Sequence, residues 1–208
     1  GAFLDADKAF EVINGMRTVE LRVLLKAINT LVLARALAAH PAINVQCSAV
    51  EGNENYTLRE RLMYLGLPAP LFTIDLDTEM GRRISRHAFQ RFFDCLEPAF
   101  GLQVTLGQVN TVVVWPALTS HAELSDEALR QAEISLTTIR IAVGDEDPRG
   151  LLAHLMQAAE LALEPECPGF SRHFGQPQAI DALYESIYVD VHRRYAASRP
   201  RMQQMLSP

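Results

Sequence analysis

Arg140 is the residue in this sequence whose position is hardest to explain by structure alone. It lies inside the alternating, apolar stretch of residues 138–143, which predicts a β-strand. A charge in the middle of a strand needs a compensating partner, because burial of an unpaired charge is costly. Three readings follow from the spacing: the guanidinium holds a ligand, pairs with an internal acid, or reaches the edge of the sheet.

A run of three acids, Asp145-Glu146-Asp147, follows this strand and raises the question of a metal site. Asp147 stands directly before Pro148, an arrangement typical of a helix start with an acceptor side chain at the cap. We therefore expect Asp147 to cap a helix and the other two acids to be solvated charges. Other candidate side chains lack the spacing of a metal site or of a nucleophile–base pair: Ser120, His121, Cys167 and His173.

The overall charge and composition limit the classes of partner. The chain has 208 residues, 49% of them hydrophobic, and a formal charge of −6, which argues against nucleic-acid binding. The longest apolar run, residues 31–39, contains Arg35 and is too short to cross a bilayer. Three widely spaced cysteines are typical of reduced thiols, so we expect a cytoplasmic protein.

Helical and strand periodicities alternate along the first 164 residues. Helices are predicted over residues 18–40, 56–65, 86–100, 126–132 and 147–163. Strands are predicted over residues 43–49, 71–76, 102–106, 111–115 and 138–143. This order indicates an α+β fold with one small sheet and helices packed mostly on one face.

The character of the sequence changes after Glu164. Residues 165–169 (PECPG) read as a linker, and residues 178–195 as one amphipathic helix. The end of this helix and the residues after it are basic, with Arg193, Arg194, Arg199 and Arg201. We therefore predict two units: a domain over residues 1–164, and a linker with a helical extension over residues 165–208.

Three motifs in order resemble the cysteine/methionine trans-sulfuration enzymes that depend on pyridoxal phosphate (PLP). Residues 104–110 (VTLGQVN) and 115–121 (WPALTSH) are similar to the signature S-L-G-G-V-E-S … H-P-A-x-x-T/S-H of that family. Residues 138–147 (TIRIAVGDED) resemble its V-R-L-S-V-G-x-E-D, and residues 15–22 (GMRTVELR) its G-L-K-T-L-x-x-R-M. The resemblance covers residues 12–163, with departures at Trp115, Gln108 and Asn110.

The resemblance implies a fold and roles for three residues. The fold is the C-terminal domain of fold-type I PLP enzymes, with a mainly antiparallel sheet and an inter-domain helix at residues 18–40. Arg140 matches the arginine that binds the substrate's α-carboxylate, which a planar guanidinium can grip through both oxygens. Thr105 matches a serine that helps to place the cofactor lysine or that carboxylate. Val104 stands where several γ-acting relatives have glutamate, so substrate preference cannot be copied from them.

The family's cofactor lysine is missing from this sequence. Its only lysines are Lys8, in an Asp-Ala-Asp-Lys context, and Lys26, inside the predicted long helix, and neither matches the Ser/Thr-rich site of the family. We therefore expect no catalytic residue and no bound PLP in this chain alone, although the full-length enzyme would use PLP.

The family implies a homo-oligomer, a dimer or tetramer, acting on an amino acid by β- or γ-elimination or replacement. The alternative is a non-catalytic module for amino-acid sensing or protein interaction. In that case the C-terminal helix would be the contact surface.

Overall fold

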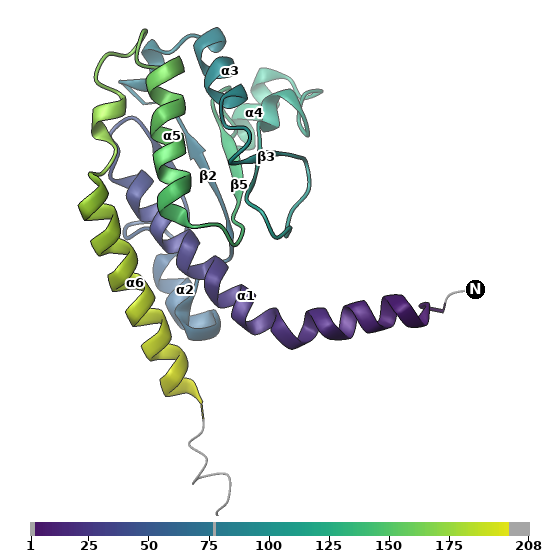
Figure 1. Ribbon diagram of the computed structural model, residues 1–208. Helices are drawn as coiled ribbons and strands as arrows, with labels where there is room; N and C mark the ends of the chain where they lie inside the picture. The colour runs from purple at the N-terminus through teal and green to yellow at the C-terminus, as the bar shows by residue number, and fades with distance from the viewer. Residues whose placement is uncertain (1–2, 77, 200–208) are drawn as a thin grey trace, which may run out of the picture.

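Helices and strands of this chain form one α+β body in a computed structural model, which describes residues 3–76 and 78–199 (Figure 1). The strands are β1 (Asn44–Gln46), β2 (Leu71–Asp75), β3 (Gly101–Leu102), β4 (Val112–Val114) and β5 (Ile139–Ala142). The α-helices are α1 (Ala6–Ala38), α2 (Tyr56–Leu62), α3 (Arg86–Asp94), α4 (Asp126–Gln131), α5 (Pro148–Ala162) and α6 (Pro177–Ser198). The predicted α+β class is confirmed.

The five strands form a single mixed sheet in the order β1-β2-β5-β4-β3. All neighbouring pairs are antiparallel except β3 and β4, which run parallel. The strand β5 therefore lies at the centre, and Arg140 pairs with Thr73 on one side and with Val114 on the other. The central position gives Arg140 a backbone held from both sides.

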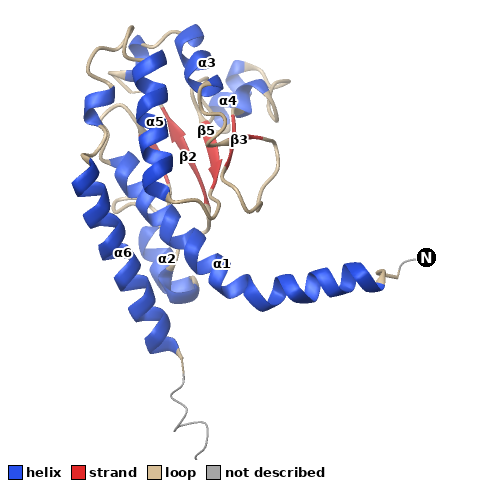
Figure 2. Ribbon diagram, in the orientation of Figure 1, coloured by secondary structure: helices blue, strands red, loops and turns tan. Residues whose placement is uncertain are grey.

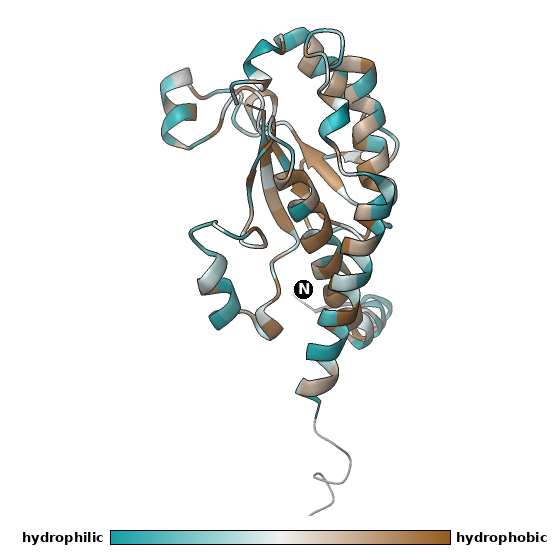
Figure 3. Ribbon diagram, turned by 90° about the vertical axis from the view of Figure 1, so that its left-hand side faces the viewer, coloured by the Kyte–Doolittle hydropathy of each residue, from teal (hydrophilic) through white to brown (hydrophobic). Residues whose placement is uncertain are grey.

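One face of the sheet forms the core with the long helices. Because side chains alternate along a strand, Ile139 and Ile141 share a face of β5 and Arg140 points to the other face. Ile139 and Ile141 are buried together with side chains from α1, α3 and α5. The helices lie in front of the strands in Figure 2, and Figure 3 shows hydrophobic residues, in brown, where the helices face the strands. Burial of each such side chain contributes about 1.5–3 kcal/mol.

Helix α1 is longer than the sequence pattern predicts. The predicted start at residue 18 is wrong, because the helix begins at Ala6 with the Asp5 side chain accepting from the Asp7 backbone N–H. Buried side chains begin only at Leu24, and the first half of the helix extends away from the sheet (Figure 1). The apolar side chains of this half, among them Phe10, Ile13 and Met16, are exposed, so an apolar period that reports core packing does not locate the start of the helix.

Two predicted boundaries in the middle of the chain are also wrong. The strand predicted over residues 102–106 ends at Leu102, since only Gly101 and Leu102 of this segment pair with β4. Residues 103–110 instead form a loop in which Gly107 adopts a φ of 79°. The helix predicted over residues 86–100 ends at Asp94, with Cys95 at its C-cap, and Pro98 disfavours a helical conformation at the residue directly before it, Glu97.

The segment after α5 packs onto the helical layer and not onto the sheet. Helix α6 lies against α1 and α5, and the segment contributes buried side chains to the same core. These side chains are Cys167, Phe170, Phe174, Ile187 and Val191. Residues 200–208, which include Arg201, lie outside the described residues.

Candidate functional site

Arg140 has a buried guanidinium nitrogen with nothing to bond to within the described chain. Its side chain is partly exposed, but the Nε atom is buried and has no hydrogen-bond partner. The sequence left open an internal acid as its partner, and no ion pair between Arg140 and an acid is present among the described residues. A buried donor without an acceptor is costly, so this geometry fits an arginine completed by an oxygen from another molecule or segment.

Polar and apolar groups divide the sheet face around Arg140. Thr73 and Val114 are its direct cross-strand neighbours, and Val114 is buried. At the far end of β2, the Asp75 carboxylate accepts hydrogen bonds from the hydroxyls of Ser135, Thr137 and Thr138 at 2.6–2.8 Å. This acid is therefore already committed to the segment that leads into β5, which leaves the face beside Arg140 to other partners.

Thr105 and Val104 lie in the loop between β3 and β4, not in a strand as predicted. Both side chains are exposed, Val104 at 61%. The loop joins β4 at the end where Val112 pairs with Ala142, two residues along β5 from Arg140. Two residues of a strand span about 7 Å, so the loop joins β4 about that far along the sheet from Arg140, which pairs with the last residue of β4, Val114. No hydrogen bond joins Arg140 to Thr105 among the described residues, so a common role for the three residues stays a prediction.

Sequence reasoning missed the polar network that holds the base of this loop. The side chain of Asn29 in α1 donates to the carbonyl oxygens of Gly144 and Glu146 at 3.1 and 2.9 Å. The Glu146 carboxylate accepts from the backbone N–H and the hydroxyl of Thr111 at 2.7–2.9 Å. The only sequence signal was the clustering of polar residues at a predicted helix–strand junction, since the partners are far apart along the chain.

Of the predictions for the three acids after β5, one is confirmed and the other is wrong. Asp147 caps α5, as predicted, by accepting from the Arg149 N–H at 2.9 Å. The guanidinium of Arg149 holds the pKa of the Asp147 carboxyl below its usual range. The prediction that Asp145 and Glu146 are solvated is wrong: both are partly buried and bonded to neighbouring segments. Among the described residues no group of three His, Cys, Asp or Glu side chains could hold a metal ion.

Neither lysine is placed to carry a cofactor. Lys8 is exposed on the projecting half of α1 and pairs with Glu11 at 3.0 Å. Lys26 is buried, donates to the carbonyl oxygen of Gln108 and lies 3.9 Å from Asp145. An amine that forms a covalent bond to a cofactor must be free to attack it and must lie in a pocket that holds the cofactor. Lys26 does not fit this role because its amine is buried and bonded, and Lys8 does not because it is 63% exposed on the helix surface.

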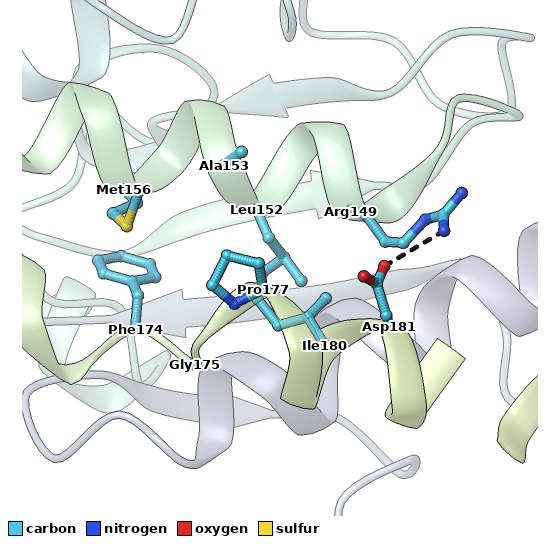
Figure 4. A pocket seen from close by; sticks show the side chains of 9 residues that line it. All are labelled: Arg149, Leu152, Ala153, Met156, Phe174, Gly175, Pro177, Ile180 and Asp181. Carbon is cyan, nitrogen blue, oxygen red and sulfur yellow. Dashed lines mark hydrogen bonds and ion pairs between the residues drawn. The ribbon is translucent and has the colours of Figure 1, made fainter. Parts of the chain in front are cut away.

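A cavity of about 100 Å³ lies between α5 and the start of α6 with the two residues before it (Figure 4). Its walls are mostly apolar, from Leu152, Met156, Phe174 and Ile180. The Arg149–Asp181 ion pair, at 3.2 Å, stands at one end. None of the lining residues belongs to the sheet, so this cavity is separate from the region of Arg140.

No helix of the described residues has the length and apolarity to cross a bilayer.

This architecture is that of solved PLP-dependent enzymes of amino-acid metabolism. A putative O-acetylhomoserine (thiol)-lyase from Campylobacter jejuni, which contains a pyridoxyl-lysine phosphate residue, superposes with a TM-score of 0.66. It is 27% identical, and the match covers 77% of this chain and 36% of that one. Cystathionine gamma-synthase from Xanthomonas oryzae, solved with cystathionine, gives a TM-score of 0.62 at 27% identity, covering 74% and 38%.

The chain belongs to the Cys/Met metabolism PLP-dependent enzyme family, whose profile matches residues 1–160. Among curated relatives, L-methionine gamma-lyase of Pseudomonas deceptionensis is 31% identical over 159 residues, which are 76% of this chain and 38% of that enzyme. Homocysteine synthase of Schizosaccharomyces pombe is 29% identical over 154 residues, 74% and 34% respectively. The chain thus spans little more than a third of the relatives' length, and the predicted family is confirmed.

Proposed function

We propose that this chain is the C-terminal part of a PLP-dependent trans-sulfuration enzyme and that Arg140 binds the substrate's α-carboxylate. The reaction is β- or γ-elimination or replacement on a sulfur-containing or O-activated amino acid. The observation that carries the proposal is the buried, partnerless Nε of Arg140 on the sheet face away from the core. A carboxylate would accept from Nε and from a terminal nitrogen together, which is the strongest pairing a guanidinium makes.

The other site residues shape the same region in this proposal. The Thr105 hydroxyl is a donor and acceptor that can orient the substrate carboxylate or a neighbouring amine. The apolar side chain of Val104 leaves its position without a charge, so the chain offers no carboxylate there to bind a cationic substituent. Substrates with an uncharged leaving group are therefore favoured over those with a second ammonium group near that position.

We assign PLP and its lysine to residues outside this chain. PLP, when bound, withdraws electrons from the substrate's α-carbon and so makes proton removal there feasible. The chain's own residues act on the substrate: Arg140 holds the carboxylate, and the rigid strand β5 fixes its direction. A direct check is to add PLP to the 208-residue chain, where no visible absorbance band of lysine-bound PLP is expected. Such a band, lost in Lys26→Arg or Lys8→Arg, would contradict the assignment.

The test of Arg140 uses the assembled enzyme that contains this chain and its PLP-binding part. Arg140→Ala is expected to lower kcat/KM roughly 10- to 150-fold, the loss of one hydrogen-bonded charge contact. Arg140→Lys keeps the charge but not the two-pronged geometry, so its loss should be intermediate. The measurement is steady-state kinetics with an O-activated homoserine or a thioether amino acid.

A matched control is Arg130→Ala, since Arg130 is exposed on α4 and pairs with Glu127 at 2.7 Å. Its kcat/KM should stay within about twofold of the unmodified enzyme. Equal effects of the two substitutions would remove Arg140 from the substrate site.

The alternative is a non-catalytic module that senses amino acids or binds a protein partner. The observation that favours it is the segment beyond residue 160, which the family profile does not reach and which adds α6 to the helical layer. Calorimetric titration of the chain with methionine or cystathionine separates the two functions. Saturable binding without any PLP-binding part would support the module.

The family relationship extends the proposal to assembly and location. We propose that the full-length enzyme is a cytoplasmic homo-oligomer, a dimer or tetramer, that binds neither nucleic acid nor membranes. The net charge of −6 and the reduced thiols Cys47, Cys95 and Cys167 support this. Sedimentation equilibrium of the assembled enzyme measures its oligomeric state, and a monomer with full activity would contradict the proposal.

A further inference from the structure

Lys26 is a buried lysine in the middle of the long helix. It is 7% exposed, although lysine is among the residues least often found fully buried. Removing an ammonium group from water costs several kcal/mol unless charged or polar groups replace the water. A lysine in this position therefore needs a structural reason.

Its two partners come from segments far along the chain. The ammonium group donates to the carbonyl oxygen of Gln108, a residue 82 positions away, and lies 3.9 Å from Oδ1 of Asp145. That Oδ1 is itself buried and has no hydrogen bond within the described residues. The ammonium and the carboxylate thus compensate each other's burial, and the hydrogen bond that Lys26 makes among the described residues goes to the loop.

The loop of residues 103–110 has few other attachments near this point. Val109 accepts at its carbonyl oxygen from the Asp145 N–H at 2.8 Å. Asp145 therefore binds the loop through its backbone N–H, and its side chain forms an ion pair with Lys26. The side chains of Val104, Leu106 and Val109 are 48–65% exposed, so apolar burial contributes little to holding the loop. Polar contacts at Gln108 and Val109 set where the loop goes.

The contacts are arranged along one helix face. Asn29, one turn after Lys26 in α1, donates to the carbonyl oxygens of Gly144 and Glu146. The helix therefore fixes the turn after β5 with Asn29 and the loop before β4 with Lys26. Since the turn follows the strand that carries Arg140 and the loop carries Thr105, α1 connects the two halves of the site.

We propose that Lys26 is a positioning residue that fixes loop 103–110 and thereby the placement of Thr105 and Val104 beside the substrate held by Arg140. Its long side chain reaches the Gln108 carbonyl from the helix, and its charge keeps the Asp145 carboxylate buried at the loop's end. The fixing of the loop follows from the contacts alone, whereas the role of Lys26 toward the substrate rests on the proposed function.

The loop is tested first, in the 208-residue chain itself. Lys26→Met keeps most of the side-chain volume and removes the donor and the charge. Hydrogen exchange followed by mass spectrometry should show faster exchange where the loop is attached, roughly tenfold at the Asp145 amide, which donates to the Val109 carbonyl oxygen of the loop, with β2 and α5 unchanged. Lys8→Met, the other lysine of α1, is the matched control and should leave exchange at this amide unchanged. Unchanged exchange there in Lys26→Met would overturn the proposal.

A second variant covers the outcome in which Lys26→Met destabilises the whole chain. Asp145→Asn keeps the backbone bond to Val109 and removes the charge that faces Lys26. It should raise exchange at the same amide by less than Lys26→Met does. Faster exchange everywhere, with no excess where the loop is attached for either variant, would show that Lys26 stabilises the fold without positioning the loop.

The role toward substrate is tested in the assembled enzyme. Lys26→Met should raise KM several-fold more than it lowers kcat, and Lys26→Arg should restore part of the affinity because it keeps a long cationic donor. A mobile loop with unchanged KM would overturn the link to substrate. If Arg140→Ala also leaves the kinetics unchanged, the proposed function fails while the exchange result for the loop still stands.

Discussion

Buried charges in this chain differ in how far the sequence reveals their purpose. The alternation of residues 138–143 was enough to predict that Arg140 is a charge in a strand, and the structure confirms this position. The partner of Lys26 was not predictable, because helical spacing says which face a residue occupies but not which distant loop meets that face. The prediction that Asp145 and Glu146 are solvated was wrong for the same reason, because the groups that bind them come from α1 and Thr111.

At the same scale, His40 links the end of α1 to the C-terminal segment. Its ring is 2% exposed and packs against Phe170 and Phe174. Nδ1 accepts from the Ala42 N–H at 3.1 Å, so Nε2 carries the proton that is donated to the Phe170 carbonyl oxygen at 2.9 Å. Burial lowers the pKa of His40, an effect that the bond to Phe170 partly offsets.

A neutral His40 makes stability depend on pH in one direction. With its pKa lower in the folded than in the unfolded chain, the unfolded chain binds more protons in the range between the two values. The contribution of neutral His40 to the free energy of unfolding is therefore fully present above about pH 6.5 and decreases as the pH falls below that value. Urea unfolding at several pH values measures it. In His40→Gln the decline below pH 6.5 should be smaller, whereas His192→Gln, an exposed control, should decline as the unmodified chain does.

At the scale of elements, boundaries were predictable where local chemistry sets them. The cap at Asp147 and the central strands β2, β4 and β5 follow from turn residues and alternation, and each lies within its predicted range. The start of α1 and the end of β3 were not predictable. The first half of α1 leaves its apolar side chains, such as Phe10, Ile13 and Met16, exposed, so its pattern does not report packing. The strand β3 pairs with β4 only through Gly101 and Leu102, which alternation in residues 102–106 does not show.

Thr111 is the side chain that joins the start of β4 to the turn between β5 and α5. It is fully buried, donates to Glu146 at 2.8 Å and accepts from the Gly144 N–H at 2.9 Å. Thr111→Val keeps the shape but leaves a buried N–H unpaired, so we expect a loss of about 1–3 kcal/mol in the free energy of unfolding. Thr119→Val, at an exposed hydroxyl bonded to the Trp115 carbonyl, should cost under about 0.5 kcal/mol. Chemical denaturation compares them, and equal losses would contradict the assigned role.

At the scale of the whole molecule, the segment after residue 164 raises the question of what completes the fold. The sequence pattern separates a domain over residues 1–164 from an extension, a division that stays a proposal. The extension nevertheless contributes Phe170 and Phe174 to the buried cluster and covers His40 at the end of α1. A linker-like composition, rich in proline and glycine, describes the local backbone and does not report whether its few apolar residues enter the core.

Phe170 gives the quantitative test of whether this extension is structural. Its side chain is 1% exposed, and its carbonyl oxygen accepts from His40, so the residue joins the extension to α1 through packing and hydrogen bonding. Phe170→Ala should lower the free energy of unfolding by about 3–5 kcal/mol, the cost of a large cavity at a packed site. Tyr188→Ala, 41% exposed on α6, should cost far less and serves as the control. If Phe170→Ala unfolds at the same denaturant concentration as Tyr188→Ala, the extension is an appendage, and residues 1–164 carry the stability of the chain by themselves.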